Sequence, residues 1–405
     1  MAGPRSPCVR PERAHTRAVF SSRSAFPRHR NELSSALSRL RHAGGELFDL
    51  TQSNPTRCEL PYANEVYAAA FADAVALPYA PEPAGLASAR RAVAEELSPR
   101  APGLSPRQVV LTSSTSEAYG FAFKLLCDAG DEILVPRPSY PLLEYLAELD
   151  GVRLVSYRLA YDGAWHVDFE SVLAARTPRT RAVVAVHPNN PTGSFLKRAE
   201  LARFSELGLP LISDEVFADY PLSADASRAP SAFGAPGVLS VTLGGLSKCV
   251  GLPQHKLAWM CLSGPPGVLE EALERLEIIA DTYLSPSIAV QAALPALFEA
   301  GAATRAAIRA RCAANLRCLS EALRDGAATA LRVEGGWYAV IRLPAVRAED
   351  TWVLELAERD RVVVEPGWFY DFEDGPMAVV CLLGPERAFA AGAARLAEGV
   401  ARAVR

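Results

Sequence analysis

Short apolar runs alternate with helical patterns along the middle of the chain. They predict strands at residues 109–111, 132–135, 152–157, 182–187, 209–213, 238–243 and 257–262, with helices after the first two that extend to residues 127 and 149. The run at 182–187 is continuously apolar, as expected for a strand that is covered on both faces. Strands that alternate with helices predict an α/β fold in which a mostly parallel sheet lies between helices.

The pattern becomes helical after Pro265. Helices are predicted at 267–282 and 287–300, followed by a long Ala/Arg/Leu stretch to residue 324. Alternation typical of strands returns at 331–342 and 361–364, and a helical segment follows at 385–404. Because 405 residues exceed one ordinary core, we predict a large domain at 49–300 and a smaller α+β domain made of 21–48 with 301–405.

Composition and charge narrow the possible function classes. Half of the residues are apolar and 22% are charged, which is typical of a globular protein. The net charge of −4 gives the whole chain no attraction for nucleic acid or for an anionic membrane. No apolar run reaches the roughly 18 residues that span a bilayer. We therefore expect neither a nucleic-acid partner nor a membrane partner.

The cysteines and the first residues of the chain bear on its location. The eight cysteines are scattered without a CxxC pair, and the six histidines show no ligand spacing. This pattern favours reduced thiols in a cytoplasmic protein, without a disulfide framework or a metal site. Residues 1–30 carry seven arginines against one acid, Glu12. We interpret 1–20 as a disordered or loosely attached arm, with a transit peptide as the alternative.

Polar residues with candidate chemistry follow several of the predicted strands. The segment 112–117 (TSSTSE) lies between a strand and a helix, where hydroxyls and backbone N–H groups suit an anion such as phosphate; helix capping alone is the alternative. The segment 187–193 (HPNNPTG) presents Asn190, which can donate to an anionic oxygen, unless the segment is a plain turn. His187 has no visible partner, and we expect it to be structural.

An acid and a lysine follow two further strands. Asp214, in SDEVF at 213–217, can hold a protonated heterocyclic nitrogen; a helix cap or a surface ion pair is the alternative. Lys248 lies in a Gly/Ser-rich turn of LGGLSKCVGLPQHKLAW at 243–259. Taken alone it is an ordinary surface lysine, but a buried lysine amine can form a Schiff base with a carbonyl cofactor. Together the four groups match the needs of pyridoxal 5′-phosphate: a phosphate site, an O3′ partner, a ring-nitrogen partner and a Schiff-base lysine.

The chain resembles the class I/II aminotransferases of the fold type I pyridoxal-phosphate family over roughly residues 45–400. Its most specific segments are NNPTG at 189–193, SDEVF at 213–217 and GGLSK at 244–248. The resemblance implies that Lys248 forms the Schiff base, that Asp214 pairs with the pyridine nitrogen and that Asn190 pairs with O3′. It also implies a homodimer with shared active sites and further cofactor contacts: phosphate binding by Ser114, Thr115, Ser116 and Ser247, ring stacking by Tyr140, and a phosphate contact from Tyr79 to the neighbouring subunit.

Three positions depart from the family pattern. Phe217 stands where many members carry a tyrosine that donates to O3′. Lys256 stands where an arginine usually helps to bind the phosphate, which keeps the charge but loses the bidentate fork. The segment 377–385 (MAVVCLLGP) has no arginine for the substrate α-carboxylate. We expect a relocated arginine, either Arg57 or Arg342, and a further substrate contact from Asn54, which lies in the same loop as Arg57 (SNPTRCEL); the alternative is a substrate without that carboxylate.

The resemblance thus implies an enzyme, a pyridoxal-phosphate-dependent aminotransferase that moves an amino group between an amino acid and a 2-oxo acid through the Lys248 Schiff base. The amino donor, the acceptor and the pathway stay open at this point. A β-eliminating C–S lyase is the alternative, since both reactions share their first steps. A non-catalytic protein that binds the cofactor is less favoured, because the residues before these motifs include family-like segments such as 79–86, and we expect no DNA-binding domain there.

Overall fold

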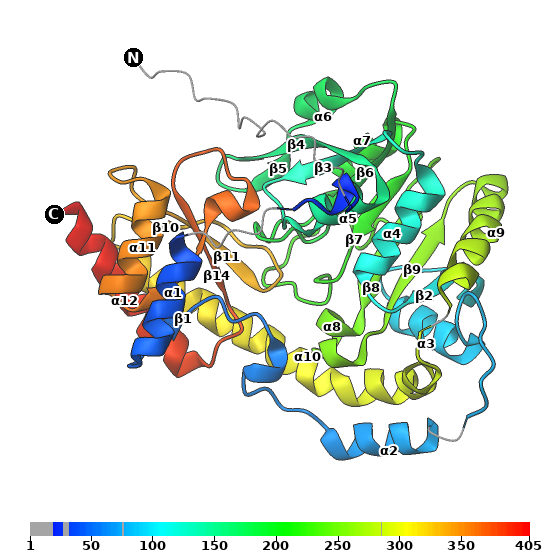
Figure 1. Cartoon of the computed structure of the whole chain (residues 1–405), viewed down its shortest axis with the longest axis horizontal. Coiled ribbons are helices and arrows are strands. Elements are labelled where there is room, and N and C mark those ends of the chain that lie inside the picture. The colour runs from blue at the N-terminus through cyan, green and yellow to red at the C-terminus, as the bar shows by residue number, and fades with distance from the viewer. Residues whose placement is uncertain (1–18, 27–31, 75–76, 285) are drawn as a thin grey trace.

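An eight-stranded sheet forms the centre of the larger part of the molecule (Figure 1). The computed structural model describes residues 19–26, 32–74, 77–284 and 286–405, so the arm expected at 1–20 lies outside the described residues apart from its last two. The strand order is β2-β9-β8-β7-β6-β3-β4-β5, and β9 and β5 run antiparallel to the other strands. The predicted α/β fold with a mostly parallel sheet is confirmed.

The strands fall into three sheets. The central sheet contains β2 Val109–Thr112, β3 Glu132–Arg137, β4 Arg153–Tyr161, β5 Trp165–Val167, β6 Thr180–Val186, β7 Leu211–Asp214, β8 Ser240–Gly245 and β9 Ala258–Ser263. A four-stranded antiparallel sheet of order β10-β11-β14-β13 contains β10 Thr329–Ala330, β11 Tyr338–Arg342, β13 Glu365–Pro366 and β14 Met377–Cys381. A parallel pair joins β1 Phe48–Asp49 to β12 Val362–Val363. Strand β14 was not predicted, although its continuously apolar sequence is typical of a strand that is buried on both faces.

Helices cover both the central sheet and the smaller sheets. They are α1 Glu32–Ala43, α2 Asn64–Ala74, α3 Ala87–Leu97, α4 Thr115–Leu126, α5 Leu142–Asp150, α6 Phe169–Ala175, α7 Arg198–Glu206, α8 Leu246–Cys249, α9 Pro266–Tyr283, α10 Ile288–Leu323, α11 Glu349–Arg359 and α12 Glu386–Val404. Short 3-10 helices lie at η1 Ser22–Ser24, η2 Pro55–Arg57, η3 Pro106–Gln108, η4 Pro253–His255 and η5 Gly367–Tyr370. Within the described ranges, none of the helices has both the length and the apolar character needed to cross a membrane.

Both faces of the central sheet are buried, which explains its continuously apolar strands. On β6, Ala182 and Val184 pack into a core that includes residues of α4 and α9. Val183 and Ala185 pack into a second core on the opposite face, together with Phe204 of α7. Because successive strand residues point to opposite faces, a strand covered on both sides needs an apolar side chain at every position.

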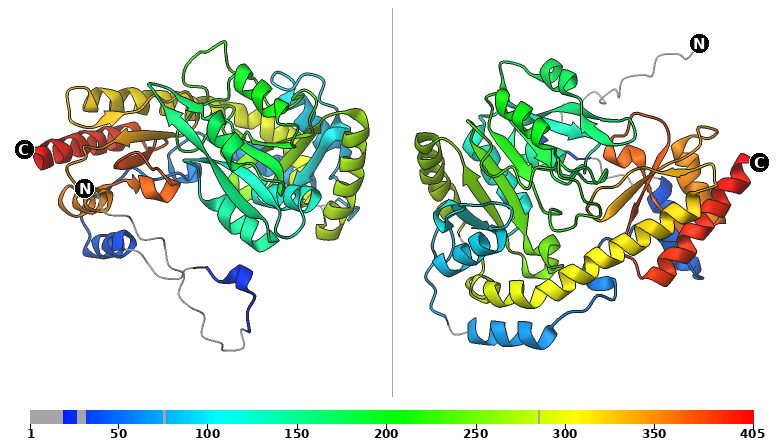
Figure 2. Two further views of the ribbon diagram at one scale, coloured as in Figure 1. Left: turned by 90° about the horizontal axis from the view of Figure 1, so that it is seen from above. Right: turned by 180° about the vertical axis from the view of Figure 1, so that it is seen from behind.

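Helix α10 is one continuous helix, where the sequence predicted two consecutive helical stretches that meet near residue 300. Gly301, at that junction, does not end the helix. A Cβ there would lie 2.6 Å from Cβ of Val250, so the glycine permits close packing of α10 against the segment that follows α8. Figure 2 shows α10 running from beside α2 to α12, so that one helix spans the central sheet and the four-stranded sheet.

Candidate functional site

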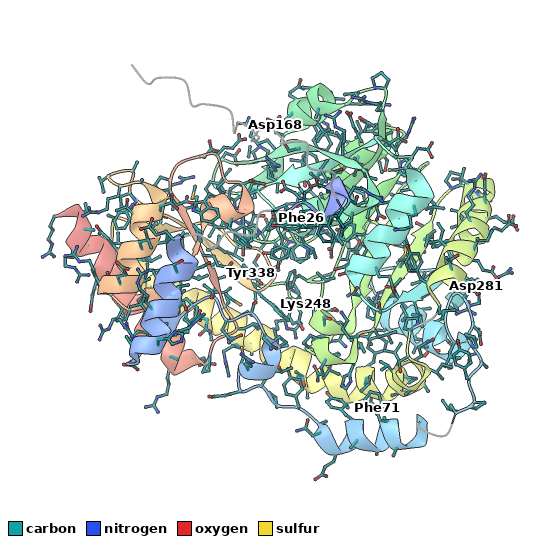
Figure 3. The ribbon with its side chains drawn as sticks, in the orientation of Figure 1. Phe26, Phe71, Asp168, Lys248, Asp281 and Tyr338 are labelled. Atoms are coloured by element: carbon teal, nitrogen blue, oxygen red, sulfur yellow. The ribbon has the colours of Figure 1, made fainter. Side chains whose placement is uncertain are left out.

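A cavity of about 340 Å³ opens at the edge of the central sheet where its parallel strands end. Open α/β sheets bind ligands at this edge. The cavity wall combines residues that follow β2, β3, β6, β7 and β8 with Tyr338 of β11, and Figure 3 shows Lys248 and Tyr338 near the middle of the molecule. Ten of the residues predicted from the sequence line this cavity: Ser114, Thr115, Ser116, Tyr140, Asn190, Asp214, Phe217, Ser247, Lys248 and Lys256.

The start of helix α4 forms one side of the cavity. Ser114 is the N-cap residue, and its Oγ accepts a hydrogen bond from the backbone N–H of Glu117 at 3.2 Å. The Glu117 carboxylate accepts a hydrogen bond from the N–H of Ser113 at 2.6 Å. Thr115 and Ser116 occupy the first helical positions and line the cavity. The positive end of the helix dipole and two hydroxyl side chains therefore face the cavity, which suits an anion.

Backbone packing around the turn after β8 fixes Lys248. Gly244, in β8, packs on Trp259 of β9, and a Cβ at residue 244 would lie 2.4 Å from Trp259 Nε1, so a larger residue does not fit. The hydroxyl of Tyr220 donates a hydrogen bond to the backbone carbonyl of Lys248 at 2.5 Å. With its backbone held from two sides, Lys248 directs its side chain into the cavity.

The amine of Lys248 lies in apolar surroundings. Its Nζ is 5.1 Å from the centre of the Trp337 ring and 5.8 Å from the centre of the Phe217 ring. Burial lowers the pKa of Lys248 below its usual value, and the nearby Cys381 and Asp214 oppose this effect. A lysine amine with reduced proton affinity can act as a nucleophile or as a base.

Asp214 places a carboxylate in the same cavity at the end of β7. Burial raises the pKa of Asp214 above its usual value. Three neighbours act in the opposite direction: the N–H of Val216 donates to Oδ1 at 3.1 Å, the hydroxyl of Tyr119 donates to Oδ2 at 3.1 Å, and the charge of Lys248 attracts the ionised form. The two hydrogen bonds fix the orientation of the carboxylate.

The loop after β6 presents Asn190. Gly193 in this loop has a φ of 69°, and a Cβ there would lie 2.6 Å from the carbonyl oxygen of Gly335, so the loop packs directly against the segment before β11. Asn190 is 9% exposed, and its amide Oδ1 has no hydrogen-bond partner within the described part of the chain. A buried amide oxygen without a partner is costly, which indicates a ligand that donates a hydrogen bond at this point. Phe217 lines the same cavity and adds no polar atom.

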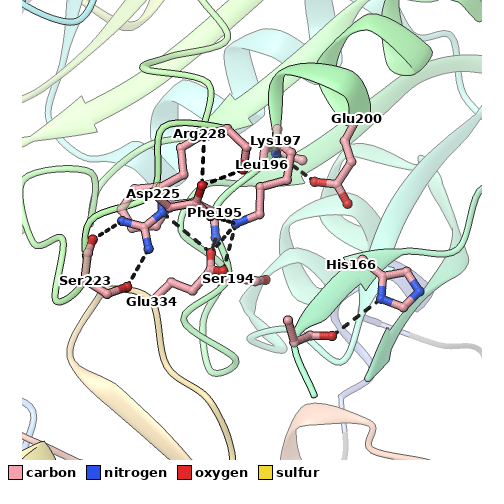
Figure 4. Close-up of polar contacts among 12 residues, drawn as sticks. His166, Ser194, Phe195, Leu196, Lys197, Glu200, Ser223, Asp225, Arg228 and Glu334 are labelled. Carbon is pink, nitrogen blue, oxygen red and sulfur yellow. Dashed lines mark hydrogen bonds and ion pairs between the residues drawn. The ribbon is translucent and has the colours of Figure 1, made fainter. Parts of the chain in front are cut away.

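Glu334, in the segment before β11, forms hydrogen bonds to Lys197 in the loop after β6, as Figure 4 shows. Its carboxylate accepts hydrogen bonds from Lys197 Nζ at 2.6 and 2.8 Å and from the N–H of Phe195 at 3.0 Å. Arg228 adds a contact from Nε to Oε2 at 3.7 Å, and Lys197 also pairs with Asp225 at 3.2 Å. Because Glu334 is almost fully buried, this network fixes the loop that carries Asn190.

His187 is buried and makes two polar contacts to the backbone. Its Nδ1 accepts a hydrogen bond from the N–H of Leu196 at 2.8 Å, and its Nε2 lies 3.1 Å from the carbonyl oxygen of Ala229. An accepting Nδ1 places the ring proton on Nε2. Burial lowers the pKa of His187 to about 3, so the ring is neutral at neutral pH. This agrees with the structural role expected from the sequence.

Four residues predicted for the site lie outside the cavity. Tyr79 is 75% exposed, and Arg57 and Arg342 are also exposed. The guanidinium of Arg342 lies 5.5 Å from the centre of the Tyr161 ring, outside the cavity wall. Asn54 caps the short helix η2 that follows it. No arginine occurs among the described residues that line the cavity.

Sequence reasoning missed four residues with hydroxyl side chains that line the cavity: Ser53, Tyr119, Ser139 and Tyr338. Tyr119 lies three residues after Ser116 in α4, and this spacing is a signal that places both side chains on one helix face. Tyr338 belongs to the four-stranded sheet, and its strand pattern does not distinguish it from a core tyrosine.

The residues of the cavity fit a flat, phosphorylated pyridine ring that carries a carbonyl group. The start of α4 suits the phosphate, and the amide N–H of Asn190 can donate to a ring oxygen. The buried carboxylate of Asp214 suits a protonated ring nitrogen. The amine of Lys248, with its lowered pKa, suits a covalent bond to the carbonyl carbon.

Comparison with known proteins agrees with this fit. The family model described as aminotransferase class I and II matches residues 52–375. The alanine aminotransferase of Mycobacterium tuberculosis is 32% identical over 266 residues, which are 63% of this chain and 61% of that protein. The S-alkyl-thiohydroximate lyase SUR1 of Arabidopsis thaliana is 32% identical over 223 residues, which are 53% of this chain and 48% of that protein. The chain thus matches less than two thirds of the length of these relatives.

A solved structure extends the similarity to nearly the whole chain. An aminotransferase from Escherichia coli superposes with a TM-score of 0.82 and 23% sequence identity, covering 95% of this chain and 98% of that one. At this identity the superposition shows a shared fold.

Proposed function

Because this chain belongs to the class I and II aminotransferase family, whose members depend on pyridoxal 5′-phosphate, we propose that it moves an amino group between an amino acid and a 2-oxo acid. One observation carries the proposal: Lys248, whose amine has a lowered pKa, lines the same cavity as the buried carboxylate of Asp214. Amino-group transfer with this cofactor needs both a lysine base and an acidic partner for the ring nitrogen.

The groups that line the cavity suggest how it holds the cofactor. In this proposal Lys248 bonds to it covalently, Asp214 pairs with the ring nitrogen, Asn190 pairs with O3′ and Tyr140 lies on a ring face. The phosphate contacts the start of α4 and its neighbours, namely Ser114, Thr115, Ser116, Ser247 and Lys256. Phe217 cannot donate a hydrogen bond, which leaves Asn190 as the O3′ partner. When bound, the cofactor supplies an electron-withdrawing ring that stabilises negative charge at the reacting carbon.

The protein's own groups then hold and move protons. Once the amino group of the donor has replaced Lys248 at the cofactor, the freed Lys248 Nζ would take the proton from Cα of the donor, since its lowered pKa favours the unprotonated amine. Asp214 keeps the ring nitrogen protonated, and the hydrogen bonds from Val216 and Tyr119 favour the ionised carboxylate that this task needs. The apolar rings around Lys248 Nζ keep water away from the proton that it carries.

We further propose a homodimer with shared active sites, a large domain at 49–300 with a smaller domain of 21–48 and 301–405, and a cytoplasmic location. The exposure of Tyr79, outside its own cavity, supports a contact to the phosphate of a neighbouring subunit. Helix α10 crosses residue 300 without a break, so it contributes to both proposed domains. The seven cysteines in the described ranges are free thiols, which supports a reducing compartment.

A panel of amino acid donors, with pyruvate or 2-oxoglutarate as acceptor, tests the proposed function. For the purified enzyme loaded with cofactor, we expect the acceptor's amino acid to form in the same amount as the donor's oxo acid. Release of oxo acid and ammonia without an acceptor would instead identify a β-eliminating lyase. A protein that binds the cofactor and gives no product with any donor would be a non-catalytic binding protein.

A further inference from the structure

The side of the cavity formed by Tyr140 and Tyr338 has no positive charge to receive a carboxylate. Among the described residues that line the cavity, the positively charged ones are Lys248 and Lys256. In the proposed function both of them contact the cofactor. A substrate carboxylate that enters a partly dry site needs a charged or multidentate partner. The part of the lining that this chain contributes therefore does not favour a carboxylate beside the two tyrosines.

Glu365 lies on the cavity-facing side of the four-stranded sheet. In β13 it pairs with Val379 of β14, and Val379 pairs with Val340 of β11. Cys381, two residues after Val379 in β14, pairs with Tyr338, two residues before Val340 in β11. Side chains two residues apart share one face of a sheet, and Tyr338 faces the cavity. Glu365 therefore points to the same side as Tyr338, although it is not itself one of the residues that line the cavity.

Glu365 has no positive partner among the described residues. Its Oε2 accepts a hydrogen bond from the Tyr370 hydroxyl, and the charged neighbour that acts on it is Asp49, which has the same sign. Burial raises the pKa of Glu365, and the hydrogen bond opposes this effect. Burial also raises the pKa values of Tyr140 and Tyr338, and the negative charge of Glu365 adds to both shifts. The field of Glu365 thus reaches two tyrosines that line the cavity.

A carboxylate in such surroundings favours a ligand with a positive charge. A partly buried ion without a counter-ion is costly, and a cation brought by a ligand removes that cost. Tyrosine rings beside the carboxylate can also contact a cation through their faces. A ligand carboxylate at the same place would be repelled by the negative charges of Glu365 and Asp49, and no guanidinium among the cavity-lining residues described would offset this repulsion.

We propose that Glu365 receives a second positive group of the amino donor, so that the site prefers donors with an additional ammonium or guanidinium group. The inference rests on the proposed function, because it names the donor class of that same cavity. The reacting amine lies at Lys248, and the second cation reaches past Tyr140 and Tyr338 to Glu365. Basic amino acids and diamines share this chemistry and differ in the α-carboxylate.

The test compares ornithine, putrescine and alanine as donors to 2-oxoglutarate in the wild-type holoenzyme and in Glu365→Gln. Glutamine keeps the size of the side chain and an oxygen that accepts the hydrogen bond of Tyr370. We expect the wild type to prefer ornithine or putrescine to alanine in kcat/KM. Glu365→Gln should reduce this preference by about tenfold or more, with little change for alanine. Glu373→Gln, at an exposed acid whose charge does not act on Tyr140 or Tyr338, is the matched control and should keep the wild-type preference.

The outcomes separate the inference from the proposed function. A preference for putrescine, for ornithine or for both supports the inference if it falls in Glu365→Gln. If alanine is the better wild-type donor, or if Glu365→Gln keeps the wild-type ratio, the inference is overturned and the proposed function stands.

If no donor of the amino acid panel is turned over either, the proposed function fails, and calorimetric titration of putrescine into both holoenzymes decides the inference separately. Binding that is about tenfold weaker in Glu365→Gln supports the inference, and equal or absent binding overturns it.

Discussion

Two partly buried ionisable residues in the cavity have pKa values shifted in opposite directions. Burial lowers the pKa of Lys248 and raises that of Asp214, because in each case it disfavours the charged form. The carboxylate that pairs with a protonated ring nitrogen of the cofactor must nevertheless be ionised. The hydroxyl of Tyr119, whose own pKa is raised well above its usual value by burial, stays protonated and donates to Asp214. Tyr119 is therefore a positioning residue for the proposed acidic partner.

Tyr119→Phe removes this hydrogen bond and keeps the ring. Because the bond lowers the pKa of Asp214, we expect that pKa to rise and the acidic limb of the kcat/KM profile to move to higher pH. The rate should fall by about 10- to 100-fold, the usual effect of a hydrogen bond to a charged group. Tyr157→Phe is the matched control, since the buried hydroxyl of Tyr157 donates to the carbonyl of Val184 and not to Asp214. A Tyr119→Phe profile that overlays the wild-type profile would remove Tyr119 from the account.

His187 makes stability depend on pH. Its folded-state pKa of about 3 lies below the unfolded-state value of about 6.5, so between these pH values the unfolded chain takes up a proton that the folded chain does not. The free energy of unfolding therefore falls as the pH drops below about 6.5, and His187 accounts for about 2 kcal/mol between pH 7 and pH 5. Urea unfolding of the wild type and of His187→Gln at these two pH values measures the difference. The variant should be less stable at pH 7 but lose less on acidification, and equal losses in the two proteins would count against this assignment.

At the scale of the elements, the loops that follow the strands need support from the second sheet. Glu334 supplies it by joining the segment before β11 to Lys197 and Phe195 in the loop that carries Asn190. Glu334→Ala leaves Lys197 and Arg228 without this buried acceptor. We expect a loss of roughly 3 kcal/mol in the free energy of unfolding and weaker cofactor binding.

The control for this prediction is an exposed ion pair. Glu358 pairs with Arg39 at 3.1 Å, and both side chains are about half exposed or more. Glu358→Ala should change the free energy of unfolding by less than about 1 kcal/mol, because exposed pairs contribute little. Denaturant unfolding of both variants gives the comparison, and an equal effect of the two substitutions would show that Glu334 does not fasten the loop.

The sequence predicted the elements of the central sheet better than those of the smaller sheets. Strands such as β6 are buried on both faces, so their composition alone marks them. Strands β10 and β13 are two residues long, which is too short to show the alternation by which a sequence marks a strand. In the cavity, the residues of motifs such as SDEVF were predictable, whereas Tyr338 was not. Tyr338 lines the cavity because the four-stranded sheet packs beside the central sheet, and the sequence pattern of a single strand does not encode that packing.

At the scale of the whole molecule, the proposed dimer makes each cavity depend on two chains. Chains with Lys248→Ala and chains with Tyr79→Ala should each be poorly active alone. In a mixed dimer, the cavity with an intact Lys248 receives Tyr79 from the other chain, so one of its two sites is complete. Co-expression should therefore restore up to about a quarter of wild-type activity, because half of the dimers are mixed.

The matched control for the mixing experiment combines Lys248→Ala chains with Asp214→Asn chains. Both residues line the cavity of their own chain, so no mixed dimer has a complete site and activity should stay low. Recovery of activity in this control would contradict the proposed sharing of sites. So would a mixture of Lys248→Ala and Tyr79→Ala chains that forms dimers but recovers no activity.

The covalent bond between Lys248 and pyridoxal 5′-phosphate is the claim on which the rest of the account depends. Borohydride reduction of the loaded enzyme, followed by peptide mass mapping, tests it most directly. The account predicts one modified peptide with the cofactor on Lys248, and no such peptide from Lys248→Ala. A modified Lys256 or Lys197 in the wild type, or an unmodified Lys248 in enzyme that transfers amino groups, would contradict the account.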